Sequence, residues 1–209
     1  MERTIGRREK ERLTRRREIL AAAERLFATK GFLKTTMAEI AEESEFALAT
    51  IYQFFKGKDE IYFTLIEEKS DLLFSVIKEA IKGIPSSIEK IKRLIEIELN
   101  FFEENRDFFK IFITERSGFE WSVREELGEK IRRMYDSYIQ LIAKVIREGI
   151  RKGELKPLDP REMAYGIAGM INSFIFHWMR KTEVEPLSDK GDTLTEMVLG
   201  GLRRVKIEG

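Results

Sequence analysis

The sequence predicts an all-α protein of about nine helices. Nearly every stretch that repeats apolar residues does so at helical spacing, and no run alternates apolar and polar residues as a half-buried strand does. The chain has 209 residues, of which 43% are hydrophobic and 36% are charged. That length and composition allow a sizeable core beneath a charged surface, in one generous domain or a small domain joined to a larger one.

Several classes of protein are excluded by what the sequence lacks. It has no cysteine, which rules out disulfide scaffolds, thiolate metal sites and thiol nucleophiles. The single histidine, His177, has no carboxylate cluster with which to form a metal site. No apolar run approaches the roughly 18 residues of a membrane span, and the N-terminus lacks the apolar stretch of a signal peptide. We therefore expect a cytoplasmic protein without a metal or a cofactor.

Positive charge is concentrated at the N-terminal end. Residues 1–58 contain 13 Lys and Arg against 9 Asp and Glu, although the whole chain has a net charge of only +1. The basic residues are densest in 1–17, and we expect residues 1–13 to form a flexible basic arm. A basic end on a nearly neutral protein indicates a polyanionic partner, while a solvated tail explains the charge alone equally well.

Capping residues and stop signals mark the helices of the N-terminal part. The first helix is expected to follow Thr14 and to end at Gly31. The second is expected to start at Thr36, which forms a capping-box pattern with Glu39. The third is expected to cover 47–54.

The later helices are delimited by similar signals. The clearest start is at Asp159, where an N-cap, the first-turn proline Pro160 and the capping glutamate Glu162 follow in order. The expected ranges are 59–82, 86–105, 108–112, 122–151, 159 to beyond His177, and 190–205.

Residues 35–58 have the pattern of a helix-turn-helix. Two short helices are joined by a tight turn, and the second helix is rich in aromatic residues. In such a unit one helix crosses the DNA backbone and the next is presented to the major groove. Thr36 would offer its hydroxyl to a phosphate at a helix N-terminus, and Lys58 would add a charge-assisted phosphate contact.

Residues 14–61 resemble the DNA-binding domain of the TetR/AcrR transcriptional repressors. The match to the family signature "TLYxYFxxKEEL" runs from Thr50 to Ile61, and earlier matches include 19–23, 30–32 and 35–37. The resemblance implies a DNA-binding domain over 14–58. Transferred residue by residue, it assigns DNA contact to Thr36, Leu48, Ala49, Thr50, Tyr52, Gln53, Phe54 and Lys58.

These positions differ in the contact that their side chains suit. Gln53 is the best candidate for reading a base edge, and Leu48 and Ala49 suit apolar contact with a thymine methyl group. Phe54 could equally well pack in the interior, whereas Ile51 and Phe55 are expected in the core.

The turn departs from the family pattern "AGVSxGT" at two positions. Glu45 replaces a glycine that tolerates positive φ, at a cost on the order of 1 kcal/mol if the turn keeps that shape. Ala47 replaces the N-cap serine, which typically costs ~1 kcal/mol. These changes put the base preference in doubt more than DNA binding itself.

The resemblance implies that residues 59–209 bind a small effector and form a homodimer. Aromatic residues gather where the effector would lie, although aromatic residues at helical spacing are also typical of an ordinary core. Residues 105–109 are similar to the corresponding stretch of family members that sense fatty acyl-coenzyme A. The effector candidates are Phe74, Phe101, Phe102, Phe108, Phe109, Phe112, Tyr135, Tyr138, Asn172 and Phe174.

Small residues in the last two expected helices suit a close helix–helix interface between two subunits. Ordinary packing within one chain is the alternative reading. The interface candidates are Gly166, Gly169, Ser173, His177, Leu194, Met197, Val198, Gly201 and Leu202.

The sequence thus predicts a ligand-responsive repressor that binds a palindromic operator as a homodimer and leaves it when a hydrophobic effector, such as a fatty acyl-CoA, binds. A helical adaptor that binds polyanions without sequence specificity is the alternative. An enzyme is disfavoured because the sequence shows no Gly-rich phosphate loop, no nucleophile paired with a base and no metal-ligand spacing.

Overall fold

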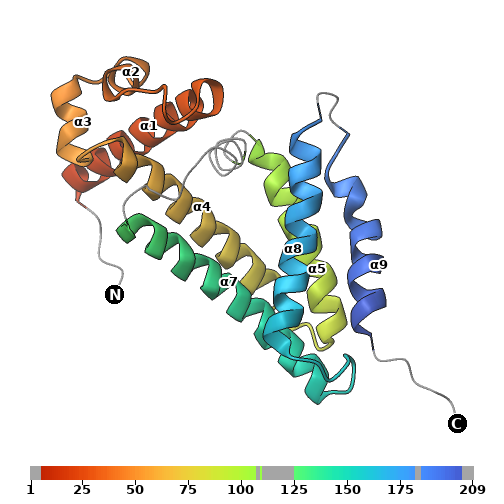
Figure 1. Cartoon of the computed structure of the whole chain (residues 1–209). Coiled ribbons are helices and arrows are strands. Elements are labelled where there is room, and N and C mark those ends of the chain that lie inside the picture. Colours follow the sequence, from red (N-terminus) through yellow and green to blue (C-terminus); the bar gives the residue numbers. More distant parts are fainter. Residues whose placement is uncertain (1–5, 107–108, 110–124, 182–184, 204–209) are drawn as a thin grey trace, which may run out of the picture. The chain divides into compact units, whose positions relative to one another are not determined.

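The computed structural model is all-α, as the sequence predicts (Figure 1). It describes residues 6–106, 109, 125–181 and 185–203. Within these residues are eight α-helices, one 3-10 turn (η1, Ser188–Lys190) and a single isolated β-bridge. The expected helix at 108–112 lies outside the described residues except for Phe109. The helices are α1 Arg7–Lys30, α2 Met37–Glu43, α3 Leu48–Phe54, α4 Lys58–Ala80, α5 Ser87–Glu104, α7 Glu125–Arg151, α8 Pro160–Met179 and α9 Gly191–Leu202.

Helix α1 begins earlier than expected. It starts at Arg7, with Gly6 as its N-cap, so the prediction of a flexible arm over residues 1–13 is wrong for residues 7–13. The charged side chains that suggested an arm are spaced for ion pairs along a helix, as in the 3.0 Å pair between Arg7 Nε and Glu11 Oε1. Such pairs at i and i+4 favour helix over coil. Residues 1–5 lie outside the described residues.

The chain divides into two compact units. Unit 1 comprises residues 1–69 and 107–120, and unit 2 comprises residues 70–106 and 121–209. The boundary falls inside α4, later than the boundary at 58–59 that the sequence suggests. Helix α4 therefore contributes its first half to unit 1 and its second half to unit 2.

Unit 1 is a three-helix domain closed by the first half of α4. Its core includes Ile19, Ile40 and Ile51, one from each of α1, α2 and α3 and all 0% exposed. The rings of Phe27 and Tyr62 meet edge to face at 5.9 Å between centroids, which joins α1 to α4. Edge-to-face aromatic pairs add to the stabilisation that burial provides.

Ion pairs reinforce the contact between α1 and α4. Arg16 of α1 pairs with Glu68 of α4, and the Lys69 ammonium lies 3.4 Å from a Glu24 carboxylate oxygen. Because α4 fixes α1 and α1 packs on α2, the position of the helix-turn-helix within unit 1 depends on the first half of α4.

The turn between α2 and α3 has the strained geometry expected from the sequence. Glu45 has φ of 58°, and it is the single non-glycine residue with positive φ in the described part of the chain. Ala47 is the N-cap of α3 and supplies no side-chain hydrogen bond to it. Glu45 therefore adopts a positive φ without the glycine that favours it, and α3 starts without a side-chain cap.

Unit 2 packs α5, α7, α8 and α9 around a common core (Figure 1). Helix α5 contributes many of its buried side chains, including Leu94 and Leu99. The start of α5 is capped from a distant part of the chain, because Glu154 Oε2 accepts hydrogen bonds from the Ser87 amide at 2.6 Å and the Ile88 amide at 3.2 Å. A carboxylate at a helix N-terminus is favoured by the helix dipole as well as by the hydrogen bonds.

The firmest sequence prediction in unit 2 is confirmed at α8. Asp159 is its N-cap, and the carboxylate accepts hydrogen bonds from the amides of Arg161 and Glu162. Pro160 occupies the first turn, where its missing N–H costs nothing.

Among the helices that the structure describes, none is long and apolar enough to cross a membrane.

Candidate functional site

Helix α3 has one exposed face, which carries both polar and apolar side chains, and an opposite face that is buried. Tyr52 is 52% exposed and Leu48 is 41% exposed, while Ile51 and Phe55 are buried, as the sequence predicts. Ala49 and Gln53 are exposed, and Thr50 and Phe54 are half-buried. The Gln53 and Tyr52 side chains make no hydrogen bond to any residue that the structure describes, so their polar groups are available to a partner.

Thr36 starts α2 with the predicted capping box. Its hydroxyl oxygen accepts a hydrogen bond from the Glu39 amide at 3.2 Å, and its own amide donates to Glu39 Oε2 at 2.8 Å. The Lys30 ammonium also bonds to this carboxylate, and together with the Thr36 bonds it lowers the pKa of Glu39 to about 2. Because the Thr36 hydroxyl also donates to Glu39 at 3.0 Å, a phosphate contact by that hydroxyl would have to replace this bond.

Lys58 does not point away from the domain but holds the loop between α1 and α2. Its ammonium donates to the carbonyl oxygens of Phe32 at 2.7 Å, Leu33 at 3.2 Å and Thr35 at 2.7 Å. An ammonium has three N–H donors, so all three are used inside unit 1. A direct phosphate bond from Lys58 would need one of these carbonyls to be given up, and that contact stays a prediction.

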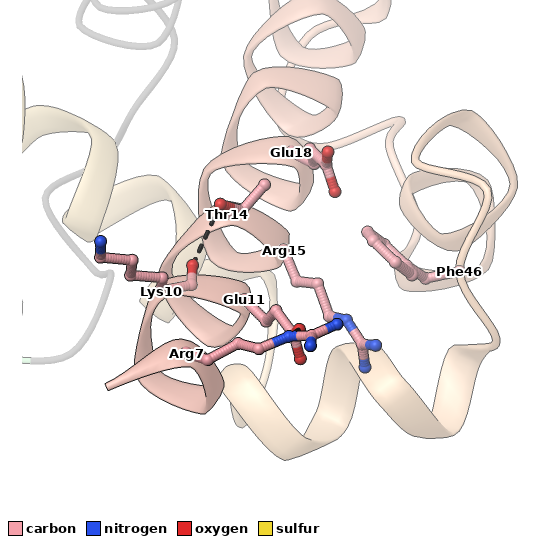
Figure 2. Close-up of a pocket in the computed structure, with 7 residues that line it drawn as sticks. All are labelled: Arg7, Lys10, Glu11, Thr14, Arg15, Glu18 and Phe46. Atoms are coloured by element: carbon pink, nitrogen blue, oxygen red, sulfur yellow. Dashed lines mark hydrogen bonds and ion pairs between the residues drawn. The ribbon is translucent and has the colours of Figure 1, made fainter. Parts of the chain in front are cut away.

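The basic start of α1 lines a shallow hollow beside the helix-turn-helix (Figure 2). The hollow has a volume of about 370 Å³. Phe46 lines it from the turn that precedes α3, so the start of α1 and the exposed helix lie in the same part of unit 1. The remaining lining residues are Arg7, Lys10, Glu11, Thr14, Arg15 and Glu18.

Three of the effector candidates come together in unit 2. The rings of Phe74 and Tyr138 stack nearly parallel, with 6.0 Å between centroids and an interplanar angle of 10°. Tyr135 adds a third ring, 6.2 Å from that of Tyr138, and contacts Tyr165 of α8 at the same distance. We call Phe74, Tyr135, Tyr138 and Tyr165 the aromatic cluster.

A buried carboxyl group is bonded to one member of the aromatic cluster. Glu98 of α5 is 3% exposed and is hydrogen-bonded to the Tyr138 hydroxyl. Burial raises the pKa of Glu98 to about 8, against a smaller opposite effect of the Tyr138 hydrogen bond. Burial, together with the neighbouring Glu98, also raises the pKa of Tyr138 well above its usual value. The pair is therefore predominantly uncharged at pH 7.

The effector candidates that the structure describes outside the aromatic cluster differ in burial. Phe101 and Phe109 are buried, and Phe102, Asn172 and Phe174 are half-buried. Phe174 lines a separate hollow of about 290 Å³ near the end of α8, together with His177 and Trp178. Phe108 and Phe112 lie outside the described residues.

The dimer candidates fall into an outward and an inward group. Leu194, Val198 and Leu202 are 0%, 1% and 9% exposed, so they belong to the core of their own chain and their assignment to a subunit interface is wrong. They lie on the side of α9 that packs on α5 and α8. The outward group consists of Gly166, Gly169, Ser173 and His177 on α8 and Met197 and Gly201 on α9.

Sequence reasoning missed Glu98 and the structural use of Lys58. Glu98 occupies a position of α5 where an apolar residue is expected, between the buried residues Ile97 and Leu99. That position is the one sign of its burial in the sequence. The three carbonyl partners of Lys58 lie 23 to 26 residues away, so no local pattern reveals them. No group of metal-ligating side chains that could hold an ion occurs in the part of the chain that the structure describes.

Comparison with known proteins bears on both units. The family model for bacterial regulatory proteins of the TetR family matches residues 19–65, and the model for the tetracyclin repressor-like C-terminal domain matches residues 85–202. The two matches cover the helix-turn-helix and most of unit 2.

Individual relatives agree with the family models. The fatty acid metabolism regulator protein of Bacillus subtilis is 25% identical over 186 residues, which cover 88% of this chain and 94% of that protein. The HTH-type transcriptional regulator YhgD of the same organism is 31% identical over 176 residues, covering 81% of this chain and 86% of that protein. The crystal structure of FadR from Bacillus subtilis in complex with stearoyl-CoA has a TM-score of 0.78 at 24% identity, covering 88% of this chain and 98% of that one.

These relatives are transcriptional regulators and not enzymes. The predicted fold, an N-terminal helix-turn-helix followed by a helical C-terminal domain, is confirmed. The chain belongs to the TetR family of DNA-binding transcriptional regulators.

Proposed function

We propose that this regulator is a repressor that binds a palindromic operator as a homodimer and releases it when a fatty acyl-CoA binds to unit 2. The observation that carries the DNA part is the exposed face of α3, where Tyr52 and Gln53 stand above the buried Ile51. A helix anchored on one side and polar on the other suits the major groove.

The basic start of α1 supports binding to the DNA backbone. Arg7, Lys10 and Arg15 line the hollow that also contains Phe46, next to α3 (Figure 2). Arginine and lysine side chains that contact phosphates supply most of the affinity that does not depend on sequence, and this affinity falls as salt rises.

The relatives and the aromatic cluster support an acyl effector. A Bacillus subtilis relative is a fatty acid metabolism regulator, and a structure with the same fold holds stearoyl-CoA. In unit 2 of this chain, Phe74 of α4 stacks on Tyr138 of α7, which supplies apolar surface for an alkyl chain.

Helix α4 is the element through which we expect the effector to act. Its first half is tied to α1 by the pairs of Glu68 and Lys69, and its second half contributes Phe74 to the aromatic cluster. An effector that favours one position of α4 would shift the population of DNA-binding geometries. In a dimer, the two α3 helices must stand about 34 Å apart to read successive turns of the major groove.

The DNA part can be tested by selecting fragments of the source genome with purified protein and measuring affinity for the enriched sequence by fluorescence anisotropy. We expect an enriched palindrome, and we expect Gln53→Ala to weaken binding to it by about tenfold, the typical cost of one base contact. Gln140→Ala on the exposed side of α7 is the matched control and should leave affinity unchanged.

The effector part can be tested on the same complex. Addition of stearoyl-CoA should release the fluorescent operator, whereas coenzyme A without an acyl chain should not. If no sequence is enriched and all DNA binds equally, the chain acts as a polyanion-binding adaptor and the repressor proposal fails. If the operator binds but no acyl-CoA releases it, the effector class alone is wrong.

A further inference from the structure

The buried Glu98 has one carboxyl oxygen that nothing in the described part of the chain satisfies. Oε1 of Glu98 is inaccessible to solvent and has no hydrogen-bond partner. A buried polar atom without a partner costs about 1–3 kcal/mol, so proteins seldom keep one without a use. The neighbouring residues of α5, Ile97 and Leu99, are buried as well, so Glu98 lies on a helix that is buried on several sides.

The hydrogen bond made by Oε2, the other carboxyl oxygen of Glu98, bears on whether Oε1 is a donor or an acceptor. The Tyr138 hydroxyl is bonded to the carboxyl group of Glu98 and can donate to its other oxygen, Oε2. With no cation acting on it among the described residues, a group this deeply buried keeps its proton. A neutral carboxyl group carries one proton, so when Oε2 accepts from the Tyr138 hydroxyl the proton lies on Oε1, which is then an O–H donor without an acceptor.

We propose that Glu98 is the polar anchor of the effector site and donates a hydrogen bond from Oε1 to a neutral carbonyl oxygen on an otherwise apolar effector. This inference rests on the proposed function and names the group that the site would recognise, the acyl carbonyl beside the chain. Phe74 stacks on the ring of Tyr138, and Tyr138 is bonded to the carboxyl group, so the alkyl chain and the carbonyl would be contacted by a connected set of side chains.

The opposite reading is that Glu98 becomes charged and attracts a cation held against the aromatic rings. Aromatic rings and a carboxylate do bind quaternary ammonium groups. The observations favour the neutral form, because the group is almost fully buried and is bonded to a hydroxyl that is itself uncharged. The test below separates the two readings.

Two substitutions distinguish a donor from a charge. In Glu98→Gln the amide oxygen can accept from Tyr138 while the NH₂ group donates from the place of Oε1, so the donor is kept and ionisation is removed. In Glu98→Leu both are removed, and an apolar side chain of similar size occupies the same buried position. Circular dichroism and a thermal unfolding curve confirm that each variant is folded.

Binding is measured by isothermal titration calorimetry with two ligands of equal chain length. Palmitoyl-CoA is a thioester, and S-hexadecyl-CoA is the matching thioether without the carbonyl. The wild-type protein should prefer the thioester by about tenfold or more, because only the thioester carbonyl gives the unpaired donor an acceptor. Glu98→Gln should keep this preference, and Glu98→Leu should lose it.

The other outcomes overturn the inference in distinguishable ways. If both CoA ligands bind the wild-type protein equally and release the operator, the proposed function stands and Glu98 is not the anchor. If neither binds, the acyl effector and the anchor both fail. If dodecyltrimethylammonium, used below its micelle concentration, binds the wild-type protein and not Glu98→Gln, the site recognises a cation and the carbonyl inference is wrong.

Discussion

The Lys58 ammonium donates a 2.7 Å hydrogen bond to the carbonyl oxygen of Phe32 and lies 4.6 Å from the centroid of the Phe32 ring. This contact ties the first residue of α4 to the loop that leads into α2. The residue that the family signature assigns to a phosphate is thus engaged with backbone carbonyls of its own domain.

Replacing Lys58 should therefore change stability more than it changes the electrostatics of DNA binding. We expect Lys58→Met to lower the free energy of unfolding by about 1–3 kcal/mol, because three carbonyl groups lose their donor. The measurement is urea unfolding followed by circular dichroism. Lys56→Met, at an exposed lysine two residues earlier, should stay within about 0.5 kcal/mol of the wild-type protein.

Salt dependence distinguishes this role from a phosphate contact. If Lys58 bonds to the loop and not to DNA, the slope of log K against log salt should be the same in Lys58→Met and in the wild-type protein. A slope that becomes shallower by about 1 would show instead that Lys58 neutralises a phosphate.

The strained turn between α2 and α3 should be relieved by glycine. Glu45 has φ of 58°, which an L-residue adopts at a cost and glycine adopts freely. Glu45→Gly should raise the free energy of unfolding by about 1 kcal/mol in the same urea assay. Glu42→Gly is the control, because Glu42 is an exposed residue within α2. Glycine at that helical position should lower the free energy of unfolding by about 1 kcal/mol. Destabilisation by both changes would contradict the role of the positive φ.

The buried Glu98 should make stability fall as pH rises. Its pKa is about 8 in the folded protein and 4.5 for an ordinary glutamate, so the folded state keeps a proton that the unfolded state loses between these values. This contribution to the free energy of unfolding is fully present below about pH 4.5 and declines by at most about 1.4 kcal/mol per pH unit until about pH 8. Glu98→Gln removes the titration.

The comparison needs the difference between variant and wild-type protein at two pH values. Between about pH 5.5 and pH 8 the free energy of unfolding of Glu98→Gln should rise by about 1 to 3 kcal/mol relative to that of the wild-type protein. Glu96→Gln, at an exposed position of the same helix, should show no such trend. A difference for Glu98→Gln that stays constant over this range would mean that the carboxyl group is already charged at pH 5.5.

The outward glycines of α8 allow a selective test of the proposed homodimer. A Cβ added at Gly169 would meet nothing within 4 Å in its own chain, and the same holds at Gly166. Gly169→Leu should therefore leave the helical content of the chain unchanged and replace a poor helix former with a good one. If α8 packs closely against its counterpart in the dimer, the leucine should increase the dimer dissociation constant at least about tenfold, measured by analytical ultracentrifugation.

A matched substitution shows whether the effect is specific to that face. Gly57→Leu adds the same side chain at another glycine with no atom within 4 Å, next to the start of α4 in unit 1. It should leave the association state unchanged. A wild-type chain that sediments as a monomer, or a Gly169→Leu variant that dimerises normally, would contradict the interface on α8.

Features that depend on neighbours in the chain were predictable from the sequence. The capping box of Thr36 and Glu39 and the N-cap Asp159 involve residues two or three positions apart, and the structure has them as predicted. The buried Ile51 and Phe55 follow from helical spacing in the same way. The start of α1 was missed because a dense run of charges resembles a tail, although the spacing of Arg7 and Glu11 suits a helix.

The helical fold, the family and the exposed face of α3 can be derived from the sequence, because helix spacing and caps act over a few residues. Which polar groups are bonded inside the protein becomes visible only in the folded structure. Glu154 caps α5 from 67 residues away, Lys58 is bound by distant carbonyls, and Glu98 is buried by helices that are remote in sequence. Burial and long-range hydrogen bonds depend on how helices pack, and no local pattern contains that information.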